Sequence, residues 1–175
     1  MIQQDRPQVI GVRHVGLGAR DPAALAEFYR EVLGLQAVPT DTDALGATAF
    51  LSARPAERSL DLALFANPAL QHTAFEVRSL ADLRALYQRV LNRGVPVKMA
   101  LNHGVSLSFY FQDPEGHLIE VYWPTGVACR PRHGDPIDLT RPEEALRQDV
   151  AESAARAAPP DQASGPAAAS RGGGE

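Results

Sequence analysis

The chain has 175 residues, of which 45% are hydrophobic, and a formal net charge of −4 at pH 7. This length allows one good hydrophobic core and is too short for two ordinary domains, and an acidic balance with scattered Lys and Arg argues against a nucleic-acid partner. The single cysteine, the lack of an apolar run that could span a membrane and an N-terminus without the order of a secretion signal predict a cytoplasmic protein without disulfides.

The first half of the chain predicts one strand, one helix and three further strands. The run VRHVGLGA reads as a short apolar strand. Asp21 is a good N-cap with Pro22 at the first helical position, and Gly34 stops the amphipathic segment AALAEFYREVL. Three short strand-like runs follow at about 35–40, 47–52 and 60–66.

The second half repeats this pattern. When the chain is shifted against itself by 58 positions, several identities align, among them His14 with His72. The strand is LQHTAFEV, Ser79 is the expected cap of the helix LADLRALYQRVLNR, and Gly94 ends it. Three strand-like runs again follow, at about 96–101, 105–112 and 117–123.

The sequence therefore predicts an α+β fold in which two tandem βαβββ modules form a curved mixed sheet around a metal-containing cleft. We expect the following organisation: an N-terminal arm over residues 1–8, the two-module domain over 9–126 with modules at about 9–66 and 70–124, an extension over 127–150 with a short helix at Pro142–Val150, and a disordered tail over 151–175, where Ala, Pro, Gly and Ser dominate.

Two histidines and one glutamate should meet in this cleft. His14 and His72 occupy equivalent positions in the two modules, and Glu120 lies in the apolar run LIEVYW, where a buried carboxylate needs a partner such as a metal. Two histidines and one carboxylate form the facial triad typical of Fe(II) or Mn(II) sites, which leaves coordination positions open. The 58-residue shift places Leu62 on Glu120, so it predicts three ligands rather than four.

The segment before Glu120 carries two further candidates. His103 lies in the turn NHG and Tyr110 in the strand that follows, so the imidazole could donate a hydrogen bond and the phenol could orient or protonate a bound oxyanion. The alternative is a loop histidine and a packed tyrosine with a solvated hydroxyl. The tetrad DPEG at 113–116 predicts a hairpin turn, and His117 after it should face away from Glu120.

These residues resemble the vicinal oxygen chelate superfamily, which includes glyoxalases, bleomycin-resistance proteins and type I extradiol ring-cleavage dioxygenases, over about residues 9–125. One series of residues resembles the sequence signature of the extradiol enzymes: His103, Phe109-Tyr110, Asp113-Pro114, Gly116 and Glu120. The chain lacks only the residue type that this signature prefers at position 101, where it has leucine. The resemblance implies that His14, His72 and Glu120 bind Fe(II), or Mn(II), and that His103 and Tyr110 line the substrate pocket.

One departure concerns acid–base catalysis. Extradiol enzymes carry a histidine immediately before the segment that here reads DLAL, and this chain has Leu60 there, which cannot move a proton. Alternation with Leu62 and Leu64 predicts that Leu60 faces the cleft.

Three functions remain open. The favoured one is an extradiol-type dioxygenase acting on a catechol-like vicinal-oxygen substrate, with a small molecule and O2 as partners. The second is a redox-neutral metal lyase, isomerase or hydrolase, and the third is a small-molecule-binding protein of the resistance type. A homodimer is compatible with all three.

Overall fold

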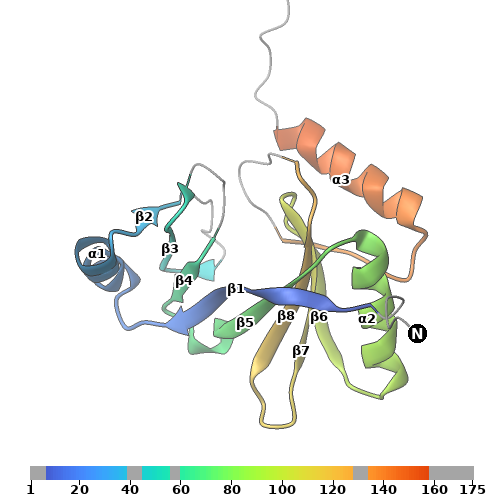
Figure 1. The fold of residues 1–175 in the computed structure, drawn as a ribbon, viewed down its shortest axis with the longest axis horizontal. Helices are drawn as coiled ribbons and strands as arrows, with labels where there is room; N and C mark the ends of the chain where they lie inside the picture. The colour runs from blue at the N-terminus through green and yellow to red at the C-terminus, as the bar shows by residue number, and fades with distance from the viewer. Residues whose placement is uncertain (1–6, 39–44, 56–59, 128–133, 158–175) are drawn as a thin grey trace, which may run out of the picture.

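The computed structural model describes residues 7–38, 45–55, 60–127 and 134–157 (Figure 1). In chain order, its elements are β1 (Val9–Gly18), α1 (Pro22–Leu33), β2 (Gln36–Ala37), β3 (Thr48–Ser52), β4 (Leu62–Phe65), the 3-10 helix η3 (Pro68–Leu70), β5 (His72–Val77), α2 (Leu80–Asn92), β6 (Val97–Asn102), β7 (Ser106–Gln112), β8 (Leu118–Pro124), β9 (Asp135–Pro136) and α3 (Glu143–Ala157).

The strands of the described residues form one mixed sheet with the order β2-β3-β4-β1-β5-β8-β7-β6-β9. The two βαβββ modules meet where β1 pairs antiparallel with β5. On either side of this pair, β4 runs parallel to β1 and β8 runs parallel to β5. Figure 1 shows α1 at one end of this sheet and α2 and α3 at the other. The predicted α+β fold with two tandem modules is confirmed.

Both module helices begin and end as their sequences predict. The side chain of Asp21 accepts a hydrogen bond from the Ala24 amide, and Gly34 closes α1 with a φ of +71°, a conformation that glycine adopts without a steric penalty. Ser79 caps α2 in the same way, through the Asp82 amide. Among the described residues, no helix is long and apolar enough to cross a bilayer.

Each module has its own hydrophobic core on the helix side of the sheet. The first is small and centres on the buried residues Ala26, Leu51, Leu62 and Leu64. The second is larger because the C-terminal extension adds Leu139, Leu146 and Val150 to the residues of α2 and its strands. Burial of each such side chain contributes about 1.5–3 kcal/mol to folding, so the extension is part of the second module's core.

Helix α3 is longer than the sequence predicted. The expected helix ended at Val150, and residues from 151 onward were expected to be disordered, yet α3 continues to Ala157. Leu146, Val150 and Ser153 are all buried, and their spacing of four and three residues places them on one helix face. The remaining tail, 158–175, lies outside the described residues.

The face of β4 was also predicted wrongly. Leu62 and Leu64 pack with Ala26 of α1 in the first core, on the side of the sheet away from the predicted cleft. Alternation therefore does not direct Leu60 into the cleft; Leu60 precedes β4 and is partly buried. The odd-numbered residues Ala63 and Phe65 occupy the cleft face instead.

Candidate metal centre

Three adjacent strands carry the three candidate ligands. Across the antiparallel β1–β5 pair, His14 lies opposite Ala74 and Gly16 lies opposite His72. Across the parallel β5–β8 pair, Ala74 lies beside Glu120. Because residues paired across strands point to the same face of a sheet, His14, His72 and Glu120 share the cleft face, at the junction of the two modules.

The ligand atoms form a compact triangle. His14 Nε2 lies 3.1 Å from His72 Nε2, and Glu120 Oε2 lies 3.2 Å from the first nitrogen and 3.4 Å from the second. The three residues are thus grouped as one possible metal site. The convergence expected from the sequence is confirmed, and the side chains involved are nearly buried.

The size and chemistry of the triangle fit a divalent ion. Two ligands that bind an ion at about 2.1 Å and at right angles lie about 3.0 Å apart, close to the three separations observed here. Unshared electron pairs that face one another at such distances in a buried site require a proton or a cation between them. The two nitrogens and one oxygen suit Fe(II) or Mn(II).

Two hydrogen bonds orient these ligands. His72 Nδ1 lies 2.7 Å from the Leu70 carbonyl oxygen, which can only accept, so this nitrogen carries the proton and Nε2 keeps its electron pair for a metal. Ser108 Oγ donates to Glu120 Oε1 at 2.6 Å, which leaves Glu120 Oε2 directed at the two imidazoles.

The ring of His72 lies directly over Gly16. A Cβ atom at this position would lie 2.7 Å from His72 Nδ1, 2.8 Å from His72 Cε1 and 3.0 Å from Phe65 Cε2. Real Cβ atoms do not approach other atoms so closely, and Gly16 therefore gives the imidazole its place on the sheet.

Electrostatics keep the carboxylate ionised. Burial alone would raise the pKa of Glu120. Hydrogen bonds from His14 and His72 and the charges of these imidazoles outweigh this effect, so the pKa of Glu120 lies well below its usual range. Burial lowers the pKa of His72, whereas a hydrogen bond with Glu120 and its charge raise it, and the net shift is upward. The Glu120 carboxylate thus favours a positive charge on the imidazole side of the site, which is the charge that a bound cation would supply.

The position equivalent to Glu120 in the first module is Ala63, where the sequence had indicated Leu62. Gly16 and Ala74 each lie two residues after a ligand histidine; Gly16 pairs with Ala63, and Ala74 pairs with Glu120. Equivalent residues of the two modules are 58 positions apart at His14 and His72 but 57 positions apart at Ala63 and Glu120. Alanine offers no ligand atom, so this position adds no fourth candidate ligand.

His103 and Tyr110 lie together beside this site. His103 Nε2 is 3.1 Å from the Tyr110 hydroxyl, and the Tyr110 ring is 6.1 Å from that of His72. Burial raises the pKa of Tyr110 well above its usual range, and the charge and a hydrogen bond of Glu120 add to this shift. The phenol therefore stays protonated and can donate a hydrogen bond.

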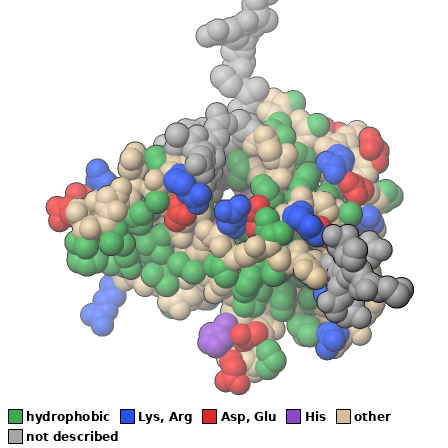
Figure 2. Space-filling model, viewed as in Figure 1, with side chains coloured by type: hydrophobic (Ala, Val, Ile, Leu, Met, Phe, Trp, Pro, Cys, Tyr) green, Lys and Arg blue, Asp and Glu red, His purple; other side chains and the backbone are tan. Residues whose placement is uncertain are grey.

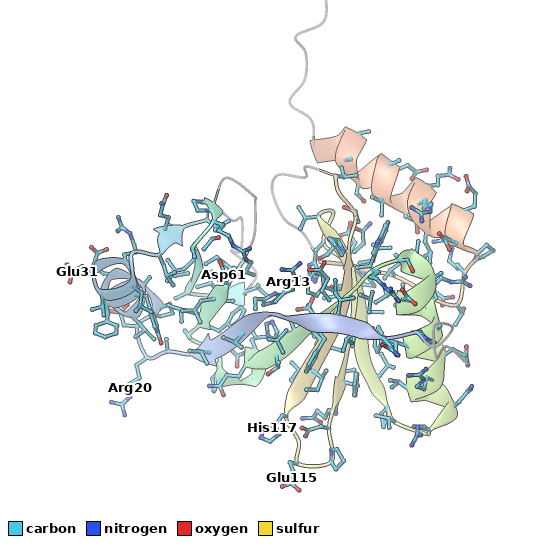
Figure 3. All side chains as sticks on the ribbon, in the orientation of Figure 1. Arg13, Arg20, Glu31, Asp61, Glu115 and His117 are labelled. Carbon is cyan, nitrogen blue, oxygen red and sulfur yellow. The ribbon has the colours of Figure 1, made fainter. Side chains whose placement is uncertain are left out.

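Sequence reasoning did not assign a role to a second polar group on the same face. The Tyr122 hydroxyl donates to Glu76 Oε2 at 3.2 Å, and Arg13 Nε donates to the same oxygen at 2.7 Å. The Tyr122 ring lies 5.7 Å from that of His14, so Tyr122 packs beside this candidate ligand. Figure 3 shows Arg13 and Asp61 in the region between the two modules. The sequence did indicate that Tyr122 shares a face with Glu120, because residues two positions apart in a strand point to the same side.

Two phenylalanines of the first module form an apolar wall that the sequence analysis also missed. The Phe65 ring lies 5.8 Å from His72 and 5.8 Å, edge to face, from Phe50. Both follow from the register of β3 and β4, which pairs Phe50 with Ala63 on the cleft face. Such a wall suits an aromatic or other flat apolar molecule.

His117 lies outside the centre. Its Nδ1 is 2.9 Å from Asp113 Oδ2, and its side chain is 73% exposed. Figure 3 shows it with Glu115 at the tip of the β7–β8 hairpin, and Figure 2 shows histidine and acidic side chains together at this end of the molecule. The turn predicted for residues 113–116 is present, with the Gly116 amide bonded to the Asp113 carbonyl.

Comparison with known proteins gives consistent matches. A family model described as the Glyoxalase/Bleomycin resistance protein/Dioxygenase superfamily matches residues 11–121. The chain is 29% identical over 120 residues to biphenyl-2,3-diol 1,2-dioxygenase 3 of Rhodococcus globerulus, a match that covers 62% of this chain and 60% of that protein.

Solved structures share the fold. A catechol 2,3-dioxygenase has a TM-score of 0.55 at 24% identity, over 73% of this chain and 45% of that one. The Mn(II)-bound glyoxalase from Novosphingobium aromaticivorans has a TM-score of 0.55 at 24% identity, over 86% of this chain and 52% of that one. The chain thus spans only about half of the length of these two proteins.

Proposed function

The chain belongs to the glyoxalase/bleomycin resistance protein/dioxygenase superfamily, and from this premise we propose that it is a metal-dependent dioxygenase that opens the ring of a catechol-like substrate. The observation that carries the proposal is the triangle of His14, His72 and Glu120, with Ala63 where a symmetric site would have a fourth ligand. Three ligands on one face leave room for a chelating substrate and O2. The 29% identity to a biphenyl-2,3-diol dioxygenase supports the same reaction class.

We propose Fe(II) as the metal, with Mn(II) as the alternative. When bound, the metal would supply the redox chemistry by which O2 reacts with an aromatic diol. The chain's own contribution is to hold the ligands in place before any metal arrives: the Leu70 carbonyl fixes the tautomer of His72, and Ser108 fixes the rotation of the Glu120 carboxylate.

Tyr110 and His103 are the proposed acid–base pair. The raised pKa of Tyr110 keeps its hydroxyl protonated, so this group can donate a hydrogen bond to a substrate oxygen that becomes negative. His103 lies 3.1 Å behind it and can return a proton to the tyrosine or accept one. This route uses neither Leu60 nor any residue of β4.

The substrate ring would lie against Phe65 and Phe50. These rings form an apolar wall next to His72, while Tyr110 and His103 provide polar groups on another side of the same histidine. An aromatic diol has the same division between an apolar ring edge and two adjacent oxygens, so the cleft and the proposed substrate are complementary.

The test is oxygen consumption by protein purified without air and loaded with Fe(II). Catechol and biphenyl-2,3-diol are the first substrates, and the expected result is one O2 consumed for each diol. The Mn(II)-loaded protein is measured in parallel, because Mn(II) is the alternative metal, and a His14→Ala chain with no bound metal is the control. A protein that binds Fe(II) in a 1:1 ratio and consumes no O2 with any catechol would refute the dioxygenase proposal.

Leu60 favours a second candidate, a redox-neutral lyase, isomerase or hydrolase. This residue stands where extradiol enzymes carry a catalytic histidine, and leucine cannot transfer a proton. A reaction in which the metal acts only as a Lewis acid on a chelated carbonyl or enediolate uses no O2, so it does not need the histidine that assists ring cleavage. Turnover of such a substrate under nitrogen would support this reaction. Equal ligand binding by metal-loaded and metal-free protein would instead indicate a binding protein.

A further inference from the structure

The turn that carries His103 is held on both sides by side chains. Asn102 Oδ1 accepts a hydrogen bond from the Gly104 amide at 2.8 Å, and Thr125 Oγ1 donates to the Gly104 carbonyl at 2.7 Å. Gly104 has a φ of +71°, which makes the turn accessible to glycine and strained for other residues. The His103 amide donates to the Ser106 carbonyl at 2.8 Å, so the backbone around the imidazole is fixed in one conformation.

Asn102 is in turn bonded to the C-terminal helix. Its Nδ2 donates to Ser153 Oγ at 3.0 Å, and Ser153 Oγ donates to the Asp149 carbonyl of α3 at 2.9 Å. Because the Gly104 amide can only donate, the oxygen of the Asn102 amide must face it, and the nitrogen must face Ser153. Asn102 and Ser153 are 4% and 3% exposed, so water cannot readily replace either partner.

Helix α3 is anchored well enough to act as a support. Leu146 and Val150 are buried in the core of the second module, and the Arg147 guanidinium lies 5.1 Å from the centre of the Trp123 ring. Strand β9 of the same extension pairs with β6, placing Asp135 opposite Asn102. All of these extension residues lie beyond residue 121, where the family match ends.

We propose that α3 is a positioning element of the site: Ser153, acting through Asn102, fixes the turn that presents the His103 imidazole to Tyr110. The chain of donors runs in one direction, from the Gly104 amide through Asn102 and Ser153 to the carbonyl of Asp149, so each bond polarises the next. Loss of the Ser153 hydroxyl leaves a buried amide without this partner and frees the turn to move. The catalytic consequence rests on the proposed function, whereas the structural consequence does not.

Ser153→Ala is the direct test, since alanine preserves the helix. The first readout is hydrogen exchange of the Gly104 amide, for which loss of one net hydrogen bond predicts about a 3- to 10-fold fall in protection. The second is the nuclear Overhauser contact between the His103 and Tyr110 rings, which should weaken. Both use the full chain and need neither metal nor substrate.

The matched control is Arg141→Gln, which removes an ion pair with Asp149 on the exposed side of α3 and leaves Ser153 in place. It should not change Gly104 protection beyond its effect on global stability. Equal losses in Ser153→Ala and Arg141→Gln would overturn the proposal, because they would show general loosening of the helix. Unchanged Gly104 protection in Ser153→Ala would overturn it as well.

A double-mutant cycle tests the catalytic consequence. If Ser153 acts through His103, Ser153→Ala lowers kcat about 3- to 10-fold in the parent chain and has no effect in a His103→Gln background. Equal effects in the two backgrounds would refute action through His103. If no dioxygenase activity is found at all, the proposed function fails, while the exchange and Overhauser results still decide whether α3 positions the turn.

Discussion

Ala63 of β4 holds, in the first module, the place that Glu120 of β8 holds in the second. Each pairs with the residue two positions after a ligand histidine, and Ala63 has no exposed surface. A side chain placed at residue 63 would therefore extend toward the metal ligands rather than into solvent. A substitution at residue 63 could therefore add a fourth candidate ligand to the site.

Ala63→Glu should convert the three-ligand site into a four-ligand site. In the metal-free protein, the added buried carboxylate lies near Glu120, and we expect the free energy of unfolding to fall by about 3–5 kcal/mol. Metal should restore much of this loss and bind more tightly, while O2 consumption is lost because a coordination position is filled. Urea unfolding with and without metal measures the first effect, with Ala63→Gln as the uncharged control. Oxygen uptake equal to that of the parent chain would contradict the place assigned to residue 63.

Ser108→Ala should weaken metal binding without removing a ligand. The Ser108 hydroxyl holds Glu120 Oε1 at 2.6 Å, and loss of such a supporting bond typically lowers metal affinity about 10- to 100-fold. Calorimetric titration with Fe(II) or Mn(II) under nitrogen measures the change in metal affinity. Ser106→Ala, on the same strand, is the control and should bind metal as the parent does. An unaltered affinity in Ser108→Ala would mean that the carboxylate is held by other groups.

Tyr110→Phe should lower catalysis and preserve metal content. The substitution keeps the ring beside His72 and removes the hydroxyl next to His103. If this hydroxyl supplies acid–base help, kcat should fall about 10²–10⁴-fold. Metal analysis of the same preparation must give the parent stoichiometry. Tyr29→Phe, in the first core away from the cleft, is the matched control, and an equal loss in both variants would speak against a role for Tyr110.

The Asp113 carboxylate should make the hairpin tip sensitive to acid. Hydrogen bonds from His117 lower the pKa of Asp113 below its usual range. A carboxyl whose pKa is lowered on folding contributes stability above its unfolded pKa of about 4 and loses this contribution as the pH falls through the folded pKa. The parent chain should thus be more stable than Asp113→Asn at pH 6, and the difference should vanish toward pH 2. Urea unfolding of both chains across this range is the measurement; a difference that stays constant with pH would exclude the carboxylate as its source.

The repeat made the convergence of the candidate ligands predictable, and a single register change limited what else could be derived from the sequence. His14 and His72 were found because each histidine lies seven residues before the N-cap of its module's helix, Asp21 in the first module and Ser79 in the second. The equivalent position in the last strand comes one residue later in the first module, because Ala63 lies 49 residues after His14 and Glu120 lies 48 residues after His72. In a strand, a change of one residue exchanges the two faces. For this reason Leu62 was placed on the cleft face, where the structure has Ala63, and the aromatic wall of Phe65 was missed.

The C-terminal helix was underestimated for a different reason. Residues 151–157 read AESAARA, and their composition was grouped with the Ala- and Gly-rich tail. Alanine and glutamate are strong helix formers, and Ser153 continues the buried face of Leu146 and Val150. Composition averaged over the whole tail hid this local periodicity, and the link from α3 to the His103 turn is a contact between distant segments that no local pattern reveals.

The space above Gly16 shows that the two modules are no longer interchangeable. The residue equivalent to Gly16 in the second module is Ala74, and His14 lies opposite its methyl group, whereas His72 occupies the volume that a methyl group at residue 16 would need. A chain built from two copies of the second module would place alanine at both positions and drive one imidazole away from the other. The two halves of the repeat therefore cannot be exchanged for one another at this position, since the ring of His72 needs a glycine opposite it and His14 tolerates an alanine.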